Sequence, residues 1–135
     1  MKDPVKKRIQ IRNQQGQTMT EFALVLPVLA LILFAVIQFG IVFNNYITLT
    51  DATRAGARKA AVSRQDPNRS SAVISAVRSS ASDLTSSKLS VSPPSSTWQS
   101  GDDVTVTASY PYSISLLGVV VKSGSLTSTT TERVE

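Results

Sequence analysis

The longest apolar run extends from Phe22 to Phe43, where Gln38 is the only polar residue and no residue is charged. As a helix, these 22 residues would rise roughly 33 Å at about 1.5 Å per residue, and the hydrocarbon layer of a bilayer is about 30 Å thick. The pattern therefore predicts one transmembrane helix. Phe43 and Tyr46 are expected near the outer membrane interface, where aromatic side chains are enriched.

A cleaved secretory signal peptide is the main alternative for such a run. Its apolar core is usually about 7 to 15 residues long and ends at a small-residue cleavage site. The run here is longer, and the residues that follow it, Asn44 to Ile47, contain no A-x-A pattern. We therefore expect the segment to stay in the membrane.

Helical character continues beyond the apolar run, since residues 44–62 contain five alanines and no proline. One helix is expected from about Thr18 to Ser63. Small residues recur every fourth position along its second half. Either another helix comes close to this face, as small-xxx-small patterns allow, or the alanines only favour helix formation. The stripe consists of Thr48, Ala52, Gly56 and Ala60.

The rest of the chain predicts a small mixed domain. Asp66-Pro67 is typical of a helix start, and apolar residues at helical spacing predict a second, short amphipathic helix to about Asp83. Alternating positions then predict strands in the ranges 89–91, 104–110 and 126–134. The expected fold class is α+β, with a small antiparallel sheet covered by helix on one face, although disorder is an alternative for the serine- and threonine-rich parts.

The apolar segment from Leu116 to Val121 does not fit the alternating pattern. Six residues are too few to span a bilayer. The segment is either a buried strand, an exposed contact with a partner or a lipid surface, or an aggregation hazard. We favour the contact segment.

The positive charge is concentrated before Gly16. The net charge is +5, and the first fifteen residues hold five cationic side chains against the single acid Asp3. Cationic flanks of a membrane helix stay in the cytoplasm, so the N-terminus is expected inside and the C-terminal part outside. This placement indicates membrane topology, and we expect no nucleic-acid partner. The cationic residues are Lys2, Lys6, Lys7, Arg8 and Arg12.

The composition argues against an enzyme. The chain contains neither histidine nor cysteine, which excludes Ser-His and Cys-His nucleophiles and most zinc sites. Ser87-Lys88, if on a strand, would point to opposite faces, and a solvated turn is the simpler interpretation of Asp102-Asp103. No glycine-rich phosphate loop is present. We expect no catalytic residues, no metal and no cofactor.

Three residues of the apolar helix need a physical explanation. Glu21 stands at its start, and as an acid near a helix N-terminus it gains about 0.3 to 1 kcal/mol from the dipole unless it has a specific partner. Pro27 removes the hydrogen bond to the carbonyl of Ala23, which predicts a local kink or a more flexible helix. Gln38 either bonds across packed helices or reaches the outer interface.

Taken together, these residues resemble a known family. Gly16, the run Glu21-Phe22-Ala23-Leu24-Val25-Leu26-Pro27, Gln38-Phe39-Gly40 and the run from Ala52 to Ala61 are similar to TadE-like proteins of Tad/Flp pilus systems, which carry the class III signal of type IV pilins. The resemblance implies that a prepilin peptidase cuts after Gly16 and leaves Gln17 first. Residues 1–16 would then be a basic leader, 17–63 a pilin-like helix with a transmembrane half at 22–43, and 64–135 an extracytoplasmic head.

The resemblance also supplies a partner for Glu21. After cleavage the amine of Gln17 lies four residues away, and pairing the two charges removes much of the penalty for burying either one. The same pair can form within a subunit or between neighbours, which would set the axial register of a filament. The assembly residues implied are Glu21, Phe22, Pro27, Gln38 and Gly40.

The function implied is that of a structural minor pilin or pseudopilin, which supports pilus biogenesis and adhesion. Its expected partners are the prepilin peptidase, other pilin subunits, the pilus assembly platform and the membrane. It is expected in the cytoplasmic (inner) membrane and, after assembly, in a pilus at the cell surface. The alternatives are an uncleaved membrane-anchored binding module and the main filament subunit.

Overall fold

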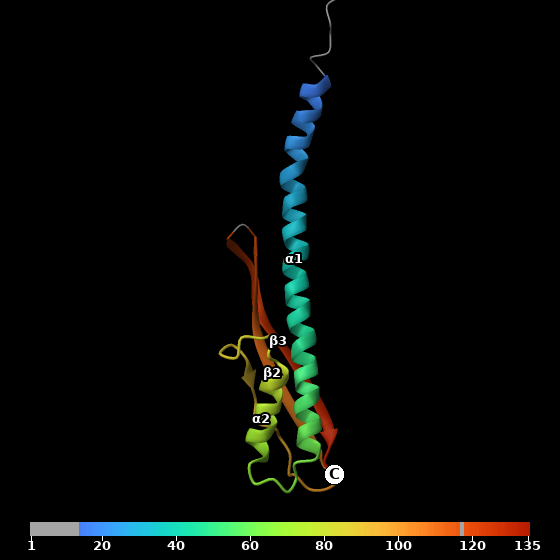
Figure 1. The fold of residues 1–135 in the computed structure, drawn as a ribbon, viewed down its shortest axis with the longest axis vertical. Helices are drawn as coiled ribbons and strands as arrows, with labels where there is room; N and C mark the ends of the chain where they lie inside the picture. The colour runs from blue at the N-terminus through green and yellow to red at the C-terminus, as the bar shows by residue number, and fades with distance from the viewer. Residues whose placement is uncertain (1–13, 117) are drawn as a thin grey trace, which may run out of the picture. The chain divides into compact units, whose positions relative to one another are not determined.

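The structure is a computed structural model that describes residues 14–116 and 118–135. Figure 1 shows its elements, and the fold class predicted from the sequence is confirmed: a long N-terminal helix, a short second helix and a three-stranded antiparallel sheet. Residues 1–13 of the predicted basic leader lie outside the described residues. The elements are α1 (Gln14–Ala61), α2 (Arg69–Ser80), β1 (Ser90–Val91), β2 (Asp103–Leu116) and β3 (Val119–Arg133).

The chain divides into two compact units between Val36 and Ile37. The first unit contains the N-terminal part of α1. The second, called here the head unit, extends from Ile37 to Glu135 and contains the rest of α1, α2 and the whole sheet.

The sheet has the strand order β1-β2-β3, with both pairs antiparallel. Its register pairs Val106 with Thr130 and Tyr110 with Leu126. Paired residues share a face of a sheet, and successive residues alternate between faces. The inward face of β2 is therefore apolar, while the other face carries hydroxyl groups.

Pairs of threonine hydroxyls join β2 and β3 across this second face. Thr105 Oγ1 lies 3.0 Å from Thr131 Oγ1, and Thr107 Oγ1 lies 3.1 Å from Thr129 Oγ1. Threonine suits these positions for two reasons. Its β-branched side chain favours the strand conformation, and its hydroxyl can form a hydrogen bond to a threonine on the neighbouring strand.

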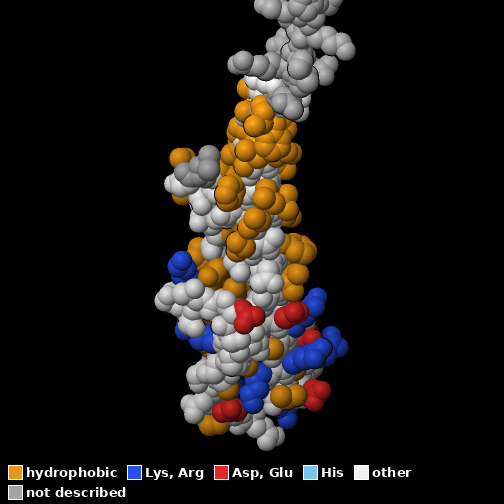
Figure 2. Space-filling view, turned by 45° about the horizontal axis from the view of Figure 1, so that its top comes forward, with side chains coloured by type: hydrophobic (Ala, Val, Ile, Leu, Met, Phe, Trp, Pro, Cys, Tyr) orange, Lys and Arg blue, Asp and Glu red, His pale blue; other side chains and the backbone are white. Residues whose placement is uncertain are grey.

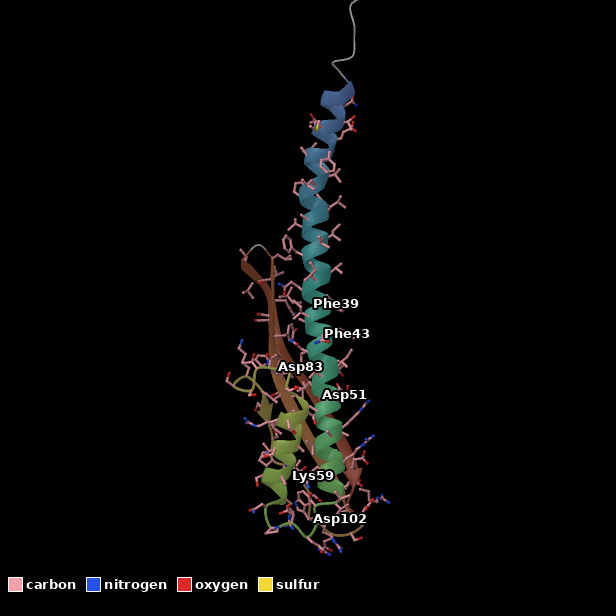
Figure 3. All side chains as sticks on the ribbon, viewed as in Figure 1. Phe39, Phe43, Asp51, Lys59, Asp83 and Asp102 are labelled. Carbon is pink, nitrogen blue, oxygen red and sulfur yellow. The ribbon has the colours of Figure 1, made fainter. Side chains whose placement is uncertain are left out.

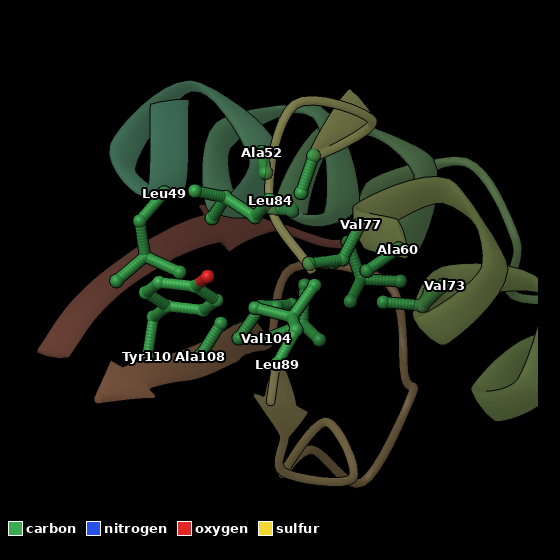
Figure 4. Packing of buried hydrophobic residues seen from close by; sticks show 14 of the residues in the cluster. Leu49, Ala52, Ala60, Val73, Val77, Leu84, Leu89, Val104, Ala108 and Tyr110 are labelled. Atoms are coloured by element: carbon green, nitrogen blue, oxygen red, sulfur yellow. The ribbon is translucent and has the colours of Figure 1, made fainter. Parts of the chain in front are cut away.

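The core lies between the sheet and the two helices. The C-terminal half of α1 and the whole of α2 cover the apolar face of β2, as Figure 4 shows for Leu49, Val77 and Tyr110. The small side chains of α1 allow this close packing. The fully buried members of the cluster are Leu49, Ala52, Ala57, Ala60, Val73, Val77, Ala81, Val104, Val106, Ala108 and Val134.

Several boundaries differ from the sequence expectation. Helix α1 begins at Gln14 and ends at Ala61, and α2 ends at Ser80. The largest difference is the β2–β3 hairpin, because β2 continues through Pro111 to Leu116. Strand β1 pairs only with residues 108 and 109, so one edge of β2 is free at Pro111, and sheets tolerate proline at a free edge.

The hairpin also excludes one of the three interpretations of the 116–121 segment. Val119, Val120 and Val121 belong to β3, and their side chains are 68%, 59% and 62% exposed. The buried-strand alternative is therefore wrong for these three residues. Gly118 forms the turn with a φ of +84°, a conformation that side chains disfavour.

Candidate functional site

Glu21 has a specific partner on its own helix. The side-chain amide of Gln17 donates a hydrogen bond of 3.0 Å to Glu21 Oε1. Residues four apart lie on one face of a helix, so the spacing alone brings these two side chains together. The residue predicted to become the N-terminus is thus one turn from the carboxylate that was predicted to pair with it.

Gly16 lies in the first turns of α1 without a packing role in the described structure. A Cβ atom placed on it would meet nothing within 4 Å. Its carbonyl accepts a hydrogen bond of 2.9 Å from Thr20 Oγ1, a contact that any residue could provide. The contacts within the chain therefore do not explain why position 16 is glycine.

The N-terminal part of α1 presents apolar side chains in every direction. Phe22 is 58% exposed, and the most apolar window of the helix is not buried at all. By length and composition, this helix can cross a membrane. Figure 2 shows these apolar side chains along α1 and the charged side chains on the head unit.

The other predicted assembly residues lie along the same helix. Pro27 is inside α1, which continues on both sides of it, and Gln38 is half-buried. Gly40 has nothing within 4 Å of an added Cβ atom. Near it, the rings of Phe39 and Phe43 stack with centroids 6.5 Å apart and an interplanar angle of 11° (Figure 3).

The small-residue stripe faces the chain's own core. Ala52, Gly56 and Ala60 are buried, while Thr48 is half-buried. A Cβ atom on Gly56 would lie 2.3 Å from Val77 Cγ2 of α2 and 3.4 Å from Val106 Cγ1 of β2. The helix that approaches this face is therefore α2 of the same chain.

A buried hydroxyl contact was not foreseen. Thr53 Oγ1 lies 2.8 Å from Ser128 Oγ. It also accepts a hydrogen bond of 3.3 Å from the Thr130 hydroxyl. These residues connect α1 to β3 across 75 positions of sequence. Only the polar Thr53 beside an alanine-rich helix face could have suggested it. Among the described residues, no fully buried polar side-chain atom is left without a hydrogen bond.

The loop before β2 contacts α2 through Trp98. The guanidinium of Arg69 lies 5.1 Å from the ring centre of Trp98, which is 8% exposed. Trp98 has a φ of +60°, and its backbone N–H donates a hydrogen bond of 2.9 Å to Ser96 Oγ. Cation–π contacts of this kind stabilise by about 0.5 to 2 kcal/mol.

The groups considered for catalysis lie apart or have structural partners. Asp102 accepts a hydrogen bond from the Thr97 hydroxyl, whereas Asp103 lies 3.7 Å from Arg133 Nε. Ser87 and Lys88 lie in a turn before β1, so the assumption that they are on a strand was wrong. Over residues 14–116 and 118–135, no three acidic side chains gather as a metal site would require.

Residues 16–58 match the family model described as TadE-like protein. The match confirms the resemblance seen in the sequence over these residues. It covers Gly16, Glu21, the apolar segment and Gly56. No curated protein and no solved structure matches the chain.

Proposed function

We propose that this chain is a minor pilin or pseudopilin of a Tad-type pilus, with a structural and non-catalytic role. A prepilin peptidase removes residues 1–16, and the subunit waits in the cytoplasmic membrane with its head outside. It then joins other pilin subunits through α1. The observation that carries the proposal is the TadE-like match, which includes both Gly16 and Glu21.

Two features of Gly16 support cleavage after this residue. A Cβ atom there would meet nothing, so the fold does not require glycine at that position. A peptidase that holds the backbone closely does require a small residue. The basic residues before Gly16 would stay on the cytoplasmic side and present the cleavage site there.

The contact of Gln17 with Glu21 supports the pairing role. Cleavage would convert the backbone nitrogen of Gln17 into an ammonium group one helical turn from the carboxylate, on a helix that already brings the two side chains to 3.0 Å. A charge left unpaired in a low-dielectric environment is unfavourable by several kcal/mol. An incoming subunit that pairs its glutamate with a neighbour's amine would therefore be favoured at one axial position.

The exposed apolar surface of α1 supports assembly through this helix. The head unit has its own core, and none of the residues in the most apolar window of α1 is buried. In the membrane, lipid would cover that surface. In a pilus, the apolar helices of neighbouring subunits would replace the lipid.

Replacing Glu21 by Gln tests the proposal. The variant keeps the hydrogen-bonding shape and loses the charge, so it should insert into the membrane normally and assemble poorly into pili. Glu132→Gln is the matched control, because it removes one acid from an exposed position of β3 and should leave assembly unchanged. The readouts are membrane fractionation and the amount of the chain in sheared pili.

A second measurement tests processing directly. Intact-mass analysis of the protein from its native membrane should give a chain that begins at Gln17, and Gly16→Leu should leave the longer form. An N-terminus upstream of Gln17 in the wild type would contradict cleavage. Normal piliation in Glu21→Gln, together with loss of adhesion in variants of the head, would favour the membrane-anchored binding module instead.

A further inference from the structure

The tip of the β2–β3 hairpin is the largest exposed apolar feature of the head unit outside α1. We define the hairpin tip as Leu116 together with Val119, Val120 and Val121. The three valines are 68%, 59% and 62% exposed, although valine is among the residues most often buried in proteins. Exposed apolar surface of this kind usually marks an interaction site.

The valines do not form a single flat surface. Val119 pairs with Leu116 and Val120 pairs with Ser115, so these two valines lie on opposite faces of the hairpin. The register shifts between Ile114, which pairs with Lys122, and Ser115, which pairs with Val120. Val121 lies at this shift and has no paired residue on β2. A protein partner that docks on one face would contact only half of this surface. An apolar medium that surrounds the tip would cover all of it.

The hairpin tip also comes level with an apolar segment of α1 inside the head unit. The contact of Thr53 with Ser128 fixes one level shared by α1 and β3. From Ser128 back to Val120, the strand covers about 26 Å at roughly 3.3 Å per residue. From Thr53 back to Phe39, the helix covers about 21 Å at roughly 1.5 Å per residue.

The two elements extend from that shared level in the same direction. Figure 3 shows the hairpin reaching toward the end of the head unit where Phe39 and Phe43 are labelled. Phe39, Ile41 and Phe43 are 67%, 53% and 55% exposed. The hairpin tip thus extends to and slightly past the level of Phe39, at the end of the head unit where α1 is apolar.

We propose that the hairpin tip enters the outer boundary of the lipid bilayer in which α1 is anchored, so that the subunit contacts the membrane at two places. Lys122 follows the valines directly and is exposed. Its aliphatic stem can lie along the acyl region while its ammonium group reaches the lipid phosphates. Ser123 and Ser125 then continue β3 into the aqueous phase.

This inference rests on the proposed membrane-inserted subunit, but it has its own consequence. A second anchor restricts rotation of the head about α1, so each subunit would present a defined side to the next one. Leaving the membrane for the pilus would require withdrawal of the hairpin tip as well as of α1.

Because the chain contains no cysteine, single-cysteine variants of the full-length protein can carry one fluorophore each. We would attach nitrobenzoxadiazole at Val120→Cys in the hairpin tip, at Leu33→Cys in the apolar part of α1 and at Ser100→Cys in the exposed loop before β2. Each protein is reconstituted into vesicles of phosphatidylethanolamine and phosphatidylglycerol. Quenching by nitroxide-labelled lipid is compared with quenching by aqueous iodide, at low and at high protein-to-lipid ratio.

The inference predicts that the label at position 120 is blue-shifted and is quenched several-fold more by nitroxide lipid than the label at position 100, at both ratios. Adding Val119→Ser and Val121→Ser should reduce the lipid quenching at position 120 and leave that at position 33 unchanged. Iodide quenching alone at position 120 would overturn the inference. A blue shift that develops only at high protein ratio, without lipid quenching, would also overturn it and would indicate contact with a second copy.

The label at position 33 separates this inference from the proposed function. Lipid quenching at position 33 without quenching at position 120 would leave the anchored subunit intact and remove only the hairpin contact. Absence of lipid quenching at both positions would contradict the membrane anchor itself.

Discussion

Gly56 lies where α2 and β2 both pack closely against α1. An added Cβ atom would lie 2.3 Å from Val77 Cγ2, closer than real Cβ contacts allow. In an open helix, replacing glycine by alanine stabilises by about 1 kcal/mol, whereas overpacking a close-packed core costs about 1 to 3 kcal/mol. The steric cost should exceed the gain in helix propensity, because α2 would have to move.

We predict that Gly56→Ala lowers the free energy of unfolding of the head unit by about 1 to 2 kcal/mol. The measurement is urea unfolding in mild detergent, followed by near-ultraviolet circular dichroism of Trp98. Gly40→Ala is the matched control, since it adds the same methyl group to the same helix where nothing lies within 4 Å. An unchanged or raised stability in Gly56→Ala would show that the contact with Val77 yields easily.

Thr53 is the second residue on which the contact between α1 and the sheet depends. Its hydroxyl lies 2.8 Å from Ser128 Oγ in a buried position. Replacing Thr53 by Val keeps the shape of the side chain but removes the hydrogen-bonding group. A buried polar group that loses its partner destabilises by about 1 to 3 kcal/mol, while removing both partners can be nearly neutral.

Thr53→Val should therefore lower the free energy of unfolding by about 1 to 2 kcal/mol. The double variant Thr53→Val with Ser128→Ala should recover part of that loss, because the Ser128 hydroxyl is no longer left unpaired, while the Thr130 hydroxyl still lacks the acceptor that Thr53 provided. The same unfolding measurement on the two single variants and the double variant gives the coupling energy. Strictly additive losses would show that the two hydroxyls do not interact.

At the level of elements, the β2–β3 hairpin depends on its turn. Gly118 has a φ of +84°, where a β-branched side chain clashes with its own backbone. Gly118→Val should destabilise the hairpin by about 1 to 2 kcal/mol, whereas Gly118→Asn should cost less, because asparagine tolerates positive φ. Amide hydrogen exchange in residues 119–125 reports the difference. Equal exchange in both variants would show that the turn does not control the hairpin.

The elements also show which parts of the fold the sequence could predict. The periodicity of the apolar residues is local information, and it predicted α1, α2 and all three strands, with differences at their ends. The continuation of β2 beyond Tyr110 was missed because Pro111 is typical of a strand end. Only the short reach of β1, which leaves that edge free, allows proline there.

The pattern of apolar positions along the chain could not predict which distant segments contact each other. The stripe from Thr48 to Ala60 predicted a close neighbour but not which one, since Val77 and Val106 are far away in the sequence. Of the candidate site, the proximity of residue 17 to Glu21 could be predicted from helical spacing, whereas the contact observed comes from the side-chain amide of Gln17, and pairing of Glu21 with the amine of Gln17 stays a prediction. The hairpin tip could not be placed near the level of Phe39 without the register of β3.

At the scale of the whole molecule, the head unit contains every residue of the hydrophobic core. The first of these along the chain is Leu49, well after the apolar run. A chain that begins at Asn44 should therefore fold in water without detergent and unfold cooperatively, with a midpoint close to that of the full-length protein. Circular dichroism and calorimetry measure this. Failure of the shortened chain to fold would show that the N-terminal half of α1 contributes to the stability of the head.

The threonine pairs between β2 and β3 determine how this part of the sheet responds to pH and salt. The hydroxyl groups of Thr105, Thr107, Thr129 and Thr131 neither gain nor lose a proton in ordinary media, whereas the ion pair of Asp103 with Arg133 lies at the end of the same face. Coulomb interactions weaken as salt rises, but uncharged hydroxyls have little to lose. The two threonine pairs should therefore keep their hydrogen bonds in acidic, alkaline, fresh or saline surroundings.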